Sequence, residues 1–167
     1  LHGHIRKVAR ELVGLDILEN DVRMLRERGY AAHCADVTRP IPLNGTFDVV
    51  VVGNLIEHLS NFEGLWDNLS RLLADRGAVL VSTANPFYRE QYFYSAFKNR
   101  IMINPEHTCW IDPVALDQMA GRFGFETKRV YWIEEKWHLD QVICDSESRE
   151  FDMLTSRWEV HPEKRGI

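Results

Sequence analysis

The sequence contains no lysine- or arginine-rich run, and its formal net charge is −5 at pH 7, with an isoelectric point near 5.8. Nucleic acids and anionic membranes attract proteins through a basic patch, so we do not expect this chain to bind either broadly. It also has no apolar stretch that approaches the roughly 20 residues of a membrane span. No signal-peptide pattern opens the chain. We therefore expect no nucleic-acid partner and no membrane partner.

Cysteine is scarce, with three residues in the chain: Cys34, Cys109 and Cys144. They are odd in number and far apart, so they fit neither a disulfide framework nor a CxxC metal site. A reducing, cytoplasmic compartment is the simplest interpretation.

What the chain does contain is enough apolar sequence for one folded domain. Hydrophobic residues make up 45% of its 167 residues, which is typical of a globular protein. Strand-like and helix-like segments alternate. The predicted strands cover residues 12–16, 31–35, 47–53 and 78–83, and the predicted helices cover 3–10, 21–28, 61–74 and 112–123. This alternation predicts an α/β fold, with a mostly parallel sheet and helices on both of its faces.

The last part of the chain has a different pattern. An antiparallel strand pair at the sheet edge is predicted for residues 126–133 and 138–144. Beyond Asp145 the chain is polar and weakly patterned. A terminal helix there would carry on one face Phe151, Leu154 and Trp158. We therefore expect one domain over residues 1–145 and a polar extension over 146–167.

The stretch FDVVVVGNLIEHL, residues 47–59, is the most informative part of the chain. Its β-branched run, Val49 to Val52, is typical of a parallel strand buried on both faces. Ligands of open α/β sheets bind outside the carboxyl ends of the strands. The strand thus delivers polar residues to the place where such folds bind ligands: Asn54, Glu57 and His58. The alternative is that Glu57 and His58 merely begin a helix.

Acidic residues close two other predicted strands. Asp16 ends the first strand, where a carboxylate with two acceptor oxygens can bind both ribose hydroxyls of an adenosine. Asp36 ends the next strand, where an acid or its neighbouring backbone can reach the adenine amino group. Taken singly, each acid also suits a helix cap or a turn. Together they favour an adenosine site.

Five segments resemble a known family in order and spacing. They are VGLDI (13–17), the Ala-Asp pair at 35–36, residues 47–59, the helix at 61–74 and GAVLVSTANP (77–86). This pattern is similar to class I S-adenosylmethionine-dependent methyltransferases. The nearest likeness is to the small-molecule branch, with the ubiquinone-pathway O-methyltransferases and the methyltransferases of polysaccharide and natural-product clusters. Residues 104–126 also resemble that branch.

The resemblance implies a Rossmann-like sheet of seven strands whose last strand pair is antiparallel. It also implies S-adenosylmethionine as cofactor, with Asp16 on the ribose. The residues that match the family's cofactor site are Asp16, Ile17, Asp36, Val37, Gly53 and Asn54.

Two departures from the family pattern affect the expected site. The family's first strand and its GxGxG loop are missing, because that loop would end just before Leu1. We therefore expect the natural chain to start upstream. Some relatives hold a divalent cation with an acid–x–x–Glu–His cluster, and Asn54 replaces the first acid here. Amide oxygen is a weaker, neutral ligand for a hard cation, so we expect no metal.

An aromatic-rich insertion over residues 87–110 suits a lid above an organic acceptor. The alternatives are a helix that packs these rings into the core, or a dimer contact. His107 follows the insertion and is a candidate general base, because imidazole titrates near neutrality. His58 is the second candidate catalytic residue. Either histidine has a structural alternative.

The expected function is methyl transfer from S-adenosylmethionine to a hydroxyl or amine of a small-molecule acceptor. The alternatives are a Rossmann-type nucleotide-dependent oxidoreductase and a non-catalytic adenosine-binding protein. The expected partner is the small acceptor, and a homodimer is an alternative use of the aromatic insertion.

Overall fold

We describe the fold from a computed structural model, which describes residues 2–99, 104–135 and 153–161. The helices are α1 (His2–Ile5), α2 (Glu19–Glu27), α3 (Phe62–Leu72), α4 (Arg89–Lys98) and α5 (Pro113–Arg122), with a 3-10 turn η1 (Ile56–His58). The strands are β1 (Val13–Asp16), β2 (Ala31–Cys34), β3 (Phe47–Gly53), β4 (Leu73–Thr83), β5 (Glu126–Glu135) and β6 (Met153–His161). Within these ranges, no helix has the length and apolar character that crossing a membrane requires.

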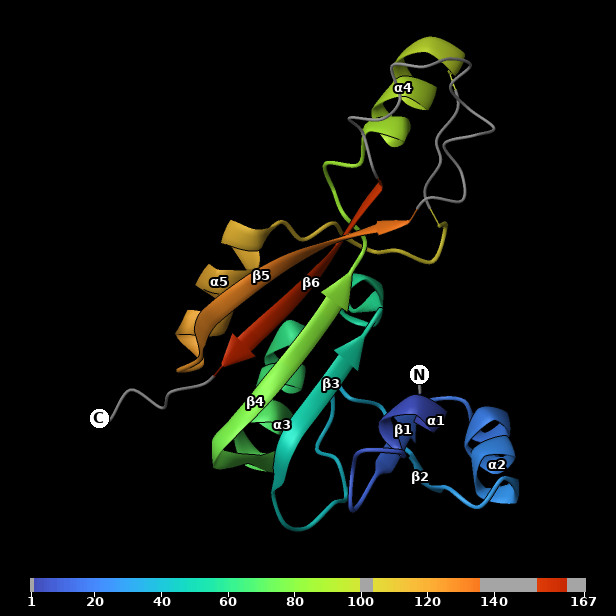
Figure 1. Ribbon diagram of the computed structural model, residues 1–167, viewed down its shortest axis with the longest axis vertical. Coiled ribbons are helices and arrows are strands. Elements are labelled where there is room, and N and C mark those ends of the chain that lie inside the picture. The colour runs from blue at the N-terminus through green and yellow to red at the C-terminus, as the bar shows by residue number, and fades with distance from the viewer. Residues whose placement is uncertain (1, 100–103, 136–152, 162–167) are drawn as a thin grey trace.

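The strands form two sheets, and the α/β class is confirmed (Figure 1). A two-stranded sheet pairs β1 with β2 in parallel, with Asp16 opposite Cys34. The second sheet has the order β3-β4-β6-β5, in which β3 and β4 are parallel and β6 runs antiparallel to both of its neighbours. The predicted antiparallel edge is therefore present.

The partner of β5 is not the one that the sequence predicted. The segment expected as a terminal helix is β6, and Trp158 pairs with Val81 of β4 and with Val130 of β5. Leu154 and Trp158 fit a helical spacing and also the alternation of a strand, and pairing with distant strands decides between them. The predicted strand at 138–144 lies outside the described residues. The expected polar extension thus contributes a strand to the sheet.

Helix α3 packs its apolar stripe on one face of β3 and β4 and forms the core with α5. Trp66 of α3 is fully buried, stacks on Phe123 at a ring distance of 6.1 Å and contacts Phe125 at 5.3 Å. The remaining members of this core include Val52, Ile56, Leu65, Leu69, Val79, Val81 and Leu116. This packing fixes the carboxyl ends of β3 and β4 against η1.

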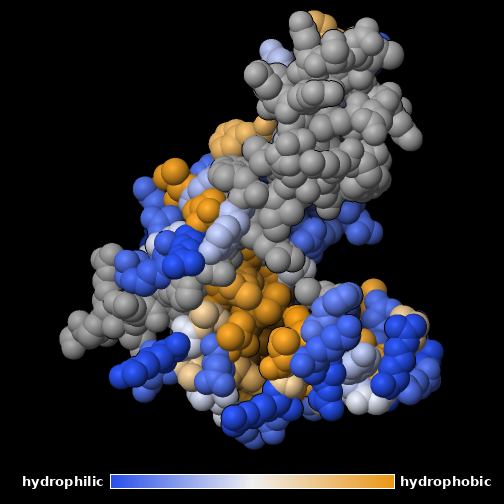
Figure 2. Space-filling model, in the orientation of Figure 1, coloured by the Kyte–Doolittle hydropathy of each residue, from blue (hydrophilic) through white to orange (hydrophobic). Residues whose placement is uncertain are grey.

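The prediction that β3 is buried on both faces is wrong for the described residues. Val52 is buried, but Val49 and Val51 are 52% and 39% exposed. Helix α3 covers only one face of the strand, and Figure 2 shows apolar surface over this part of the sheet. No strand of the described residues joins β3 to the β1–β2 sheet.

Candidate active site

The carboxyl end of β3 is tied to β4 through Asn54. Asn54 has a left-handed backbone, with φ of 48°, which is uncommon for a residue with a side chain. Its amide donates to the carbonyl of Ser82 at 2.9 Å, and the Ser82 hydroxyl donates to Asn54 Oδ1 at 2.9 Å. The amide side chain of Asn54 therefore holds the turn. Ser82 was not singled out from the sequence, although it stands one residue before the end of a predicted strand.

Asp16 is the last residue of β1 and Asp36 lies just beyond the end of β2, so both acids stand at the ends of neighbouring strands, as predicted. The Ala35 amide donates to the carbonyl of Asp16 at 2.9 Å, which brings the two strand ends together. Asp16 Oδ1 accepts the Leu18 amide at 2.9 Å, so one carboxylate oxygen shapes the turn. None of the described residues donates a hydrogen bond to Oδ2. Ile17, the next predicted site residue, is 63% exposed.

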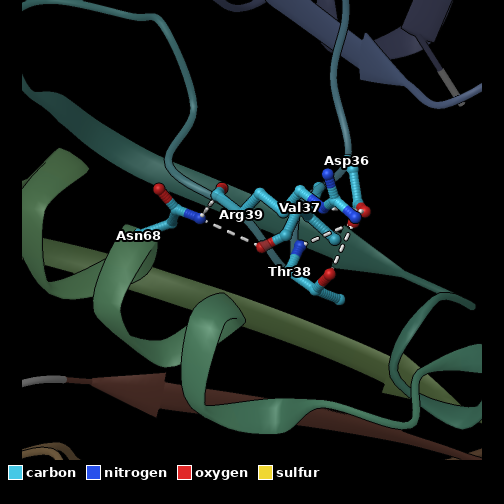
Figure 3. Close-up of polar contacts among 5 residues, drawn as sticks. All are labelled: Asp36, Val37, Thr38, Arg39 and Asn68. Carbon is cyan, nitrogen blue, oxygen red and sulfur yellow. Dashed lines mark hydrogen bonds and ion pairs between the residues drawn. The ribbon is translucent and has the colours of Figure 1, made fainter.

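The Asp36 carboxylate is used within its own loop (Figure 3). Its Oδ1 accepts the Thr38 hydroxyl at 2.7 Å and the Thr38 amide at 2.9 Å, and Arg39 lies 3.4 Å from Oδ2. The hydrogen bonds from Thr38, aided by the Arg39 charge, hold the pKa of the Asp36 carboxyl below its usual value. The Asp36 carboxylate thus stabilises the conformation of this loop through Thr38 and Arg39, and the apolar residue Val37 lies next to it in the sequence.

A buried asparagine on α3 holds the same loop, and the sequence reasoning missed it. Asn68 is 4% exposed, and its Nδ2 donates to the carbonyls of Val37 at 3.0 Å and Arg39 at 2.7 Å (Figure 3). Its Oδ1 accepts the Ile41 amide at 3.1 Å. One turn further along the helix, Arg71 donates to the carbonyl of Ile41 at 2.7 Å. The sequence does contain a signal for Asn68, because it is a polar residue within the apolar stripe of the helix predicted at residues 61–74.

Helix α3 also approaches this loop closely at Gly64. A Cβ atom at that position would collide with the carbonyl oxygen of Thr38. Gly64, Asn68 and Arg71 lie on one face of α3 and contact the backbone of residues 36–43. We call this set the α3 clamp.

The polar residues after β3 belong to a cluster of three titratable side chains, Glu57, His58 and His107. The Glu57 side chain is 1% exposed, and its Oε2 is buried without a hydrogen-bond partner. The rings of His58 and His107 meet edge to face, with centroids 4.7 Å apart. One potential ligand atom from each of the three residues lies within 4.8 Å of the others. The prediction thus named both histidines, and the structure brings them together.

Backbone contacts hold the His107 segment against η1. The Thr108 amide donates to the carbonyl of Glu57 at 2.8 Å, and the Thr108 hydroxyl donates to the carbonyl of Leu59 at 2.7 Å. His58 Nδ1 lies 3.3 Å from the carbonyl oxygen of Glu106. Since a carbonyl oxygen only accepts, this contact places a proton on Nδ1.

Comparison with known proteins decides the family. A family model described as a methyltransferase domain matches residues 3–130. The chain belongs to the methyltransferase-domain family. The predicted enzyme class, S-adenosylmethionine-dependent methyltransferase, is confirmed at this level, as is the methyl-donor cofactor. No curated protein sequence matches the chain.

Solved structures share the fold of this methyltransferase domain. Magnesium protoporphyrin IX methyltransferase from Synechocystis PCC 6803, solved with bound SAH, has a TM-score of 0.69 at 13% identity and covers 97% of this chain and 68% of its own. A SAM-dependent methyltransferase from Archaeoglobus fulgidus has a TM-score of 0.65 at 19% identity, with coverage of 96% and 81%. A possible histamine N-methyltransferase from Thermotoga maritima has a TM-score of 0.65 at 17% identity, with coverage of 91% and 72%.

In this methyltransferase domain, the aromatic insertion projects beyond the end of the sheet as α4 (Figure 1). Phe87, Tyr92 and Phe97 are 68%, 73% and 70% exposed. The alternative that the insertion packs these three rings into the core is therefore wrong. A lid and a dimer contact both remain compatible with this exposure.

The site residues of the methyltransferase domain form two groups. Asp16 and the loop of Asp36 lie at the ends of β1 and β2, whereas Asn54 and the Glu57 cluster follow β3. The described hydrogen bonds do not link these groups. A small apolar cavity at the amino end of β4 contains none of the predicted site residues; it is lined by Ser70, Leu73, Ala74, Asp75, Phe123, Gly124 and Phe125.

Proposed function

We propose that this methyltransferase transfers a methyl group from S-adenosylmethionine to a hydroxyl or amine of a small-molecule acceptor. The observation that carries the proposal is the contact between His58 and His107 beside the end of β3. Imidazole accepts protons near neutral pH, so either ring suits an acceptor that loses a proton as its new bond to carbon forms. Family membership favours methyl transfer over the hydride transfer of an oxidoreductase.

The cofactor is proposed to lie across the strand ends. Asp16 Oδ2 and a ribose hydroxyl are complementary as acceptor and donor. Because the Asp36 carboxylate is occupied by Thr38, the adenine contacts are assigned to the backbone and side chain of Val37. The methionine end is assigned to Gly53 and Asn54.

Several features support a small acceptor and α4 as its lid. Two structural neighbours, a magnesium protoporphyrin IX methyltransferase and a possible histamine N-methyltransferase, carry the names of small-molecule acceptors. The exposed rings of α4 offer apolar surface beyond the strand ends. The alternative is that α4 of one molecule packs against α4 of a second molecule in a homodimer. Sedimentation of the full-length protein measures its oligomeric state and so distinguishes a lid from a dimer contact. The free thiols of Cys34 and Cys109 fit the proposed cytoplasmic location.

The proposal is tested by incubating the full-length protein with S-adenosylmethionine and a panel of alcohols, phenols and amines, with release of S-adenosylhomocysteine as the readout. With the accepted substrate, His58→Ala or His107→Ala should lower turnover by about 10²–10⁴-fold, with S-adenosylhomocysteine affinity retained. His4→Ala, which removes an exposed histidine of α1, is the matched control. Near-normal turnover by both folded site variants would contradict the catalytic role of the histidines.

A further inference from the structure

We propose that Ser82 of β4 is a positioning residue for the cofactor. Its hydroxyl holds Asn54 in a left-handed conformation, and this conformation presents the end of β3 to the methionine part of S-adenosylmethionine. The inference rests on the proposed function, which assigns the methionine end to Gly53 and Asn54. It adds a residue that acts through Asn54 and does not itself contact the cofactor.

The conformation of Asn54 needs support from outside its own turn. Its φ is 48°, and this region is unfavourable for a residue with a side chain, although asparagine tolerates it better than most. Asn54 is exposed, so burial does not hold it in place. Such backbone conformations persist where the surrounding structure fixes them, and they cluster at ligand sites. Among the described residues, Ser82 supplies the contacts that fix this one.

Ser82 contacts both the backbone and the side chain of Asn54. The Asn54 amide donates to the carbonyl of Ser82 at 2.9 Å, and the Ser82 hydroxyl oxygen accepts from the same amide at 3.2 Å. The hydroxyl in turn donates to Asn54 Oδ1 at 2.9 Å. Alanine at position 82 would keep the contact of the carbonyl and lose both contacts of the hydroxyl. The hydroxyl therefore restrains Asn54 beyond what the pairing of the strands provides.

The direction of one peptide group explains why this conformation matters for a ligand. The described residues contain no cis peptide bond, and the N–H and C=O of a trans peptide point in opposite directions. Since the Asn54 amide points at β4, the carbonyl of Gly53 points toward the other edge of β3. Figure 1 shows the β1–β2 sheet, which carries Asp16, beyond that edge. A rotation of the Gly53–Asn54 peptide would turn this acceptor away from the proposed cofactor site.

The place of this pair in the sheet fits a role in ligand binding. Gly53 lies opposite Ser82 in the parallel register of β3 and β4, so the two strands end at the same level. Ligands of open α/β sheets bind outside such carboxyl ends. The alternative is that Ser82 only joins the two strand ends. That role would lower the melting temperature on removal of the hydroxyl and leave the ligand affinities of the folded protein unchanged.

Two ligands separate these roles in calorimetric titrations of the full-length protein. S-adenosylhomocysteine carries the amino-acid end of the cofactor, whereas 5′-methylthioadenosine has a methyl group on sulfur in its place. A hydrogen bond between neutral groups contributes a factor of about 2–12 to an equilibrium constant, so Ser82→Ala should bind S-adenosylhomocysteine about 5- to 10-fold more weakly. Its affinity for 5′-methylthioadenosine should be unchanged. Ser70→Ala, at a half-buried serine beside the cavity at the amino end of β4, is the matched control and should change neither affinity.

A second pair of variants tests whether Ser82 acts through Asn54. Glycine adopts the left-handed conformation without steric cost, so a chain with Asn54→Gly does not need the Ser82 hydroxyl to reach it. Adding Ser82→Ala to Asn54→Gly should therefore change the affinity for S-adenosylhomocysteine by less than about twofold. The same substitution in the unchanged background should show the full loss.

The proposal is overturned if Ser82→Ala binds S-adenosylhomocysteine normally, if it loses both ligands equally, or if its loss is the same beside Asn54→Gly. Should Ser82→Ala not fold, Ser82→Cys decides by the same titrations, because it nearly keeps the size of the side chain and weakens its hydrogen bonds. A failure of the proposed function gives a different result. An unchanged full-length protein that does not bind S-adenosylhomocysteine contradicts the cofactor assignment and the role of Ser82 with it, whereas normal binding by Ser82→Ala contradicts the role of Ser82 alone.

Discussion

Replacing Asn68 by alanine tests how strongly the α3 clamp holds the loop proposed to bind adenine. The substitution removes the donor to the carbonyls of Val37 and Arg39 and the acceptor of the Ile41 amide. Alanine is a good helix former, so the helix itself is expected to persist. The loss therefore acts on the attachment between α3 and the loop.

The size of the effect follows from burial. Arg39 is exposed, so water replaces the lost donor at its carbonyl. The carbonyl of Val37 and the amide of Ile41 are shielded, and each unsatisfied buried group costs about 1–3 kcal/mol. Allowing for relaxation, we expect a loss of about 2–4 kcal/mol in the free energy of unfolding. For a chain of this length that lowers Tm by about 4–16 °C.

Calorimetric melting of the full-length Asn68→Ala variant measures this loss. Asp67→Ala, at the neighbouring exposed position of α3, is the matched control and should change stability by less than about 0.5 kcal/mol. Below its melting range, Asn68→Ala should also bind S-adenosylhomocysteine more weakly, while turnover at saturating cofactor changes less. An Asn68→Ala variant as stable as Asp67→Ala would refute the clamp.

Three further results are expected. Gly64→Ala should destabilise the fold, because the added Cβ would collide with the Thr38 carbonyl. Gly121→Ala in α5, where the added Cβ meets nothing, should be neutral or stabilising by up to about 1 kcal/mol, and thermal melts of both variants measure the difference. Asp112→Ala removes the side-chain acceptor of two amides at 2.8 and 3.0 Å and should cost about 1 kcal/mol in denaturant unfolding, with an unchanged midpoint as the contrary result. Because Thr38 lowers the folded-state pKa of Asp36, this carboxylate stabilises the fold above about pH 4, and the contribution is lost as the pH falls through the folded-state pKa. Thr38→Val should raise the Asp36 pKa in an NMR titration, and an unshifted value would contradict the assignment.

The parts of the fold that the sequence predicted well depend on local signals. The β-branched run after Gly45 marks β3, and the Asp112-Pro113 pair marks the start of α5. Capping is a contact between residues two or three positions apart, so a pattern in one segment is sufficient to reveal it. The position of Asp16 and Asp36 at neighbouring strand ends follows in the same way from two short predicted strands that are each closed by an acid.

The parts that were missed depend on distant partners. Leu154 and Trp158 satisfy two periodicities, and only the edges of β4 and β5 select the strand. In the sequence, Asn68 interrupts the apolar stripe of a predicted helix without an evident reason. Its role depends on the loop that contains Val37, whose position the sequence does not predict. His107 was predicted as a lone base, but its meeting with Glu57 depends on how residues 104–110 fold back on η1. The spacing of residues in the sequence does not predict that residues 104–110 pack against η1.

The central claim, that the cofactor binds across the strand ends, is tested most directly at Asp16. Asp16→Asn keeps Oδ1 for the Leu18 amide and replaces Oδ2 by an NH₂ group, so the turn is retained while the charged acceptor for the ribose hydroxyls is removed. A hydrogen bond to a charged group contributes about 1.5–3 kcal/mol. Calorimetric titration of the full-length variant with S-adenosylhomocysteine should therefore show affinity about 10- to 150-fold weaker, with an unchanged melting temperature and with Asp48→Ala as an exposed control on β3. A folded Asp16→Asn variant that binds S-adenosylhomocysteine as tightly as the unchanged protein would contradict the account.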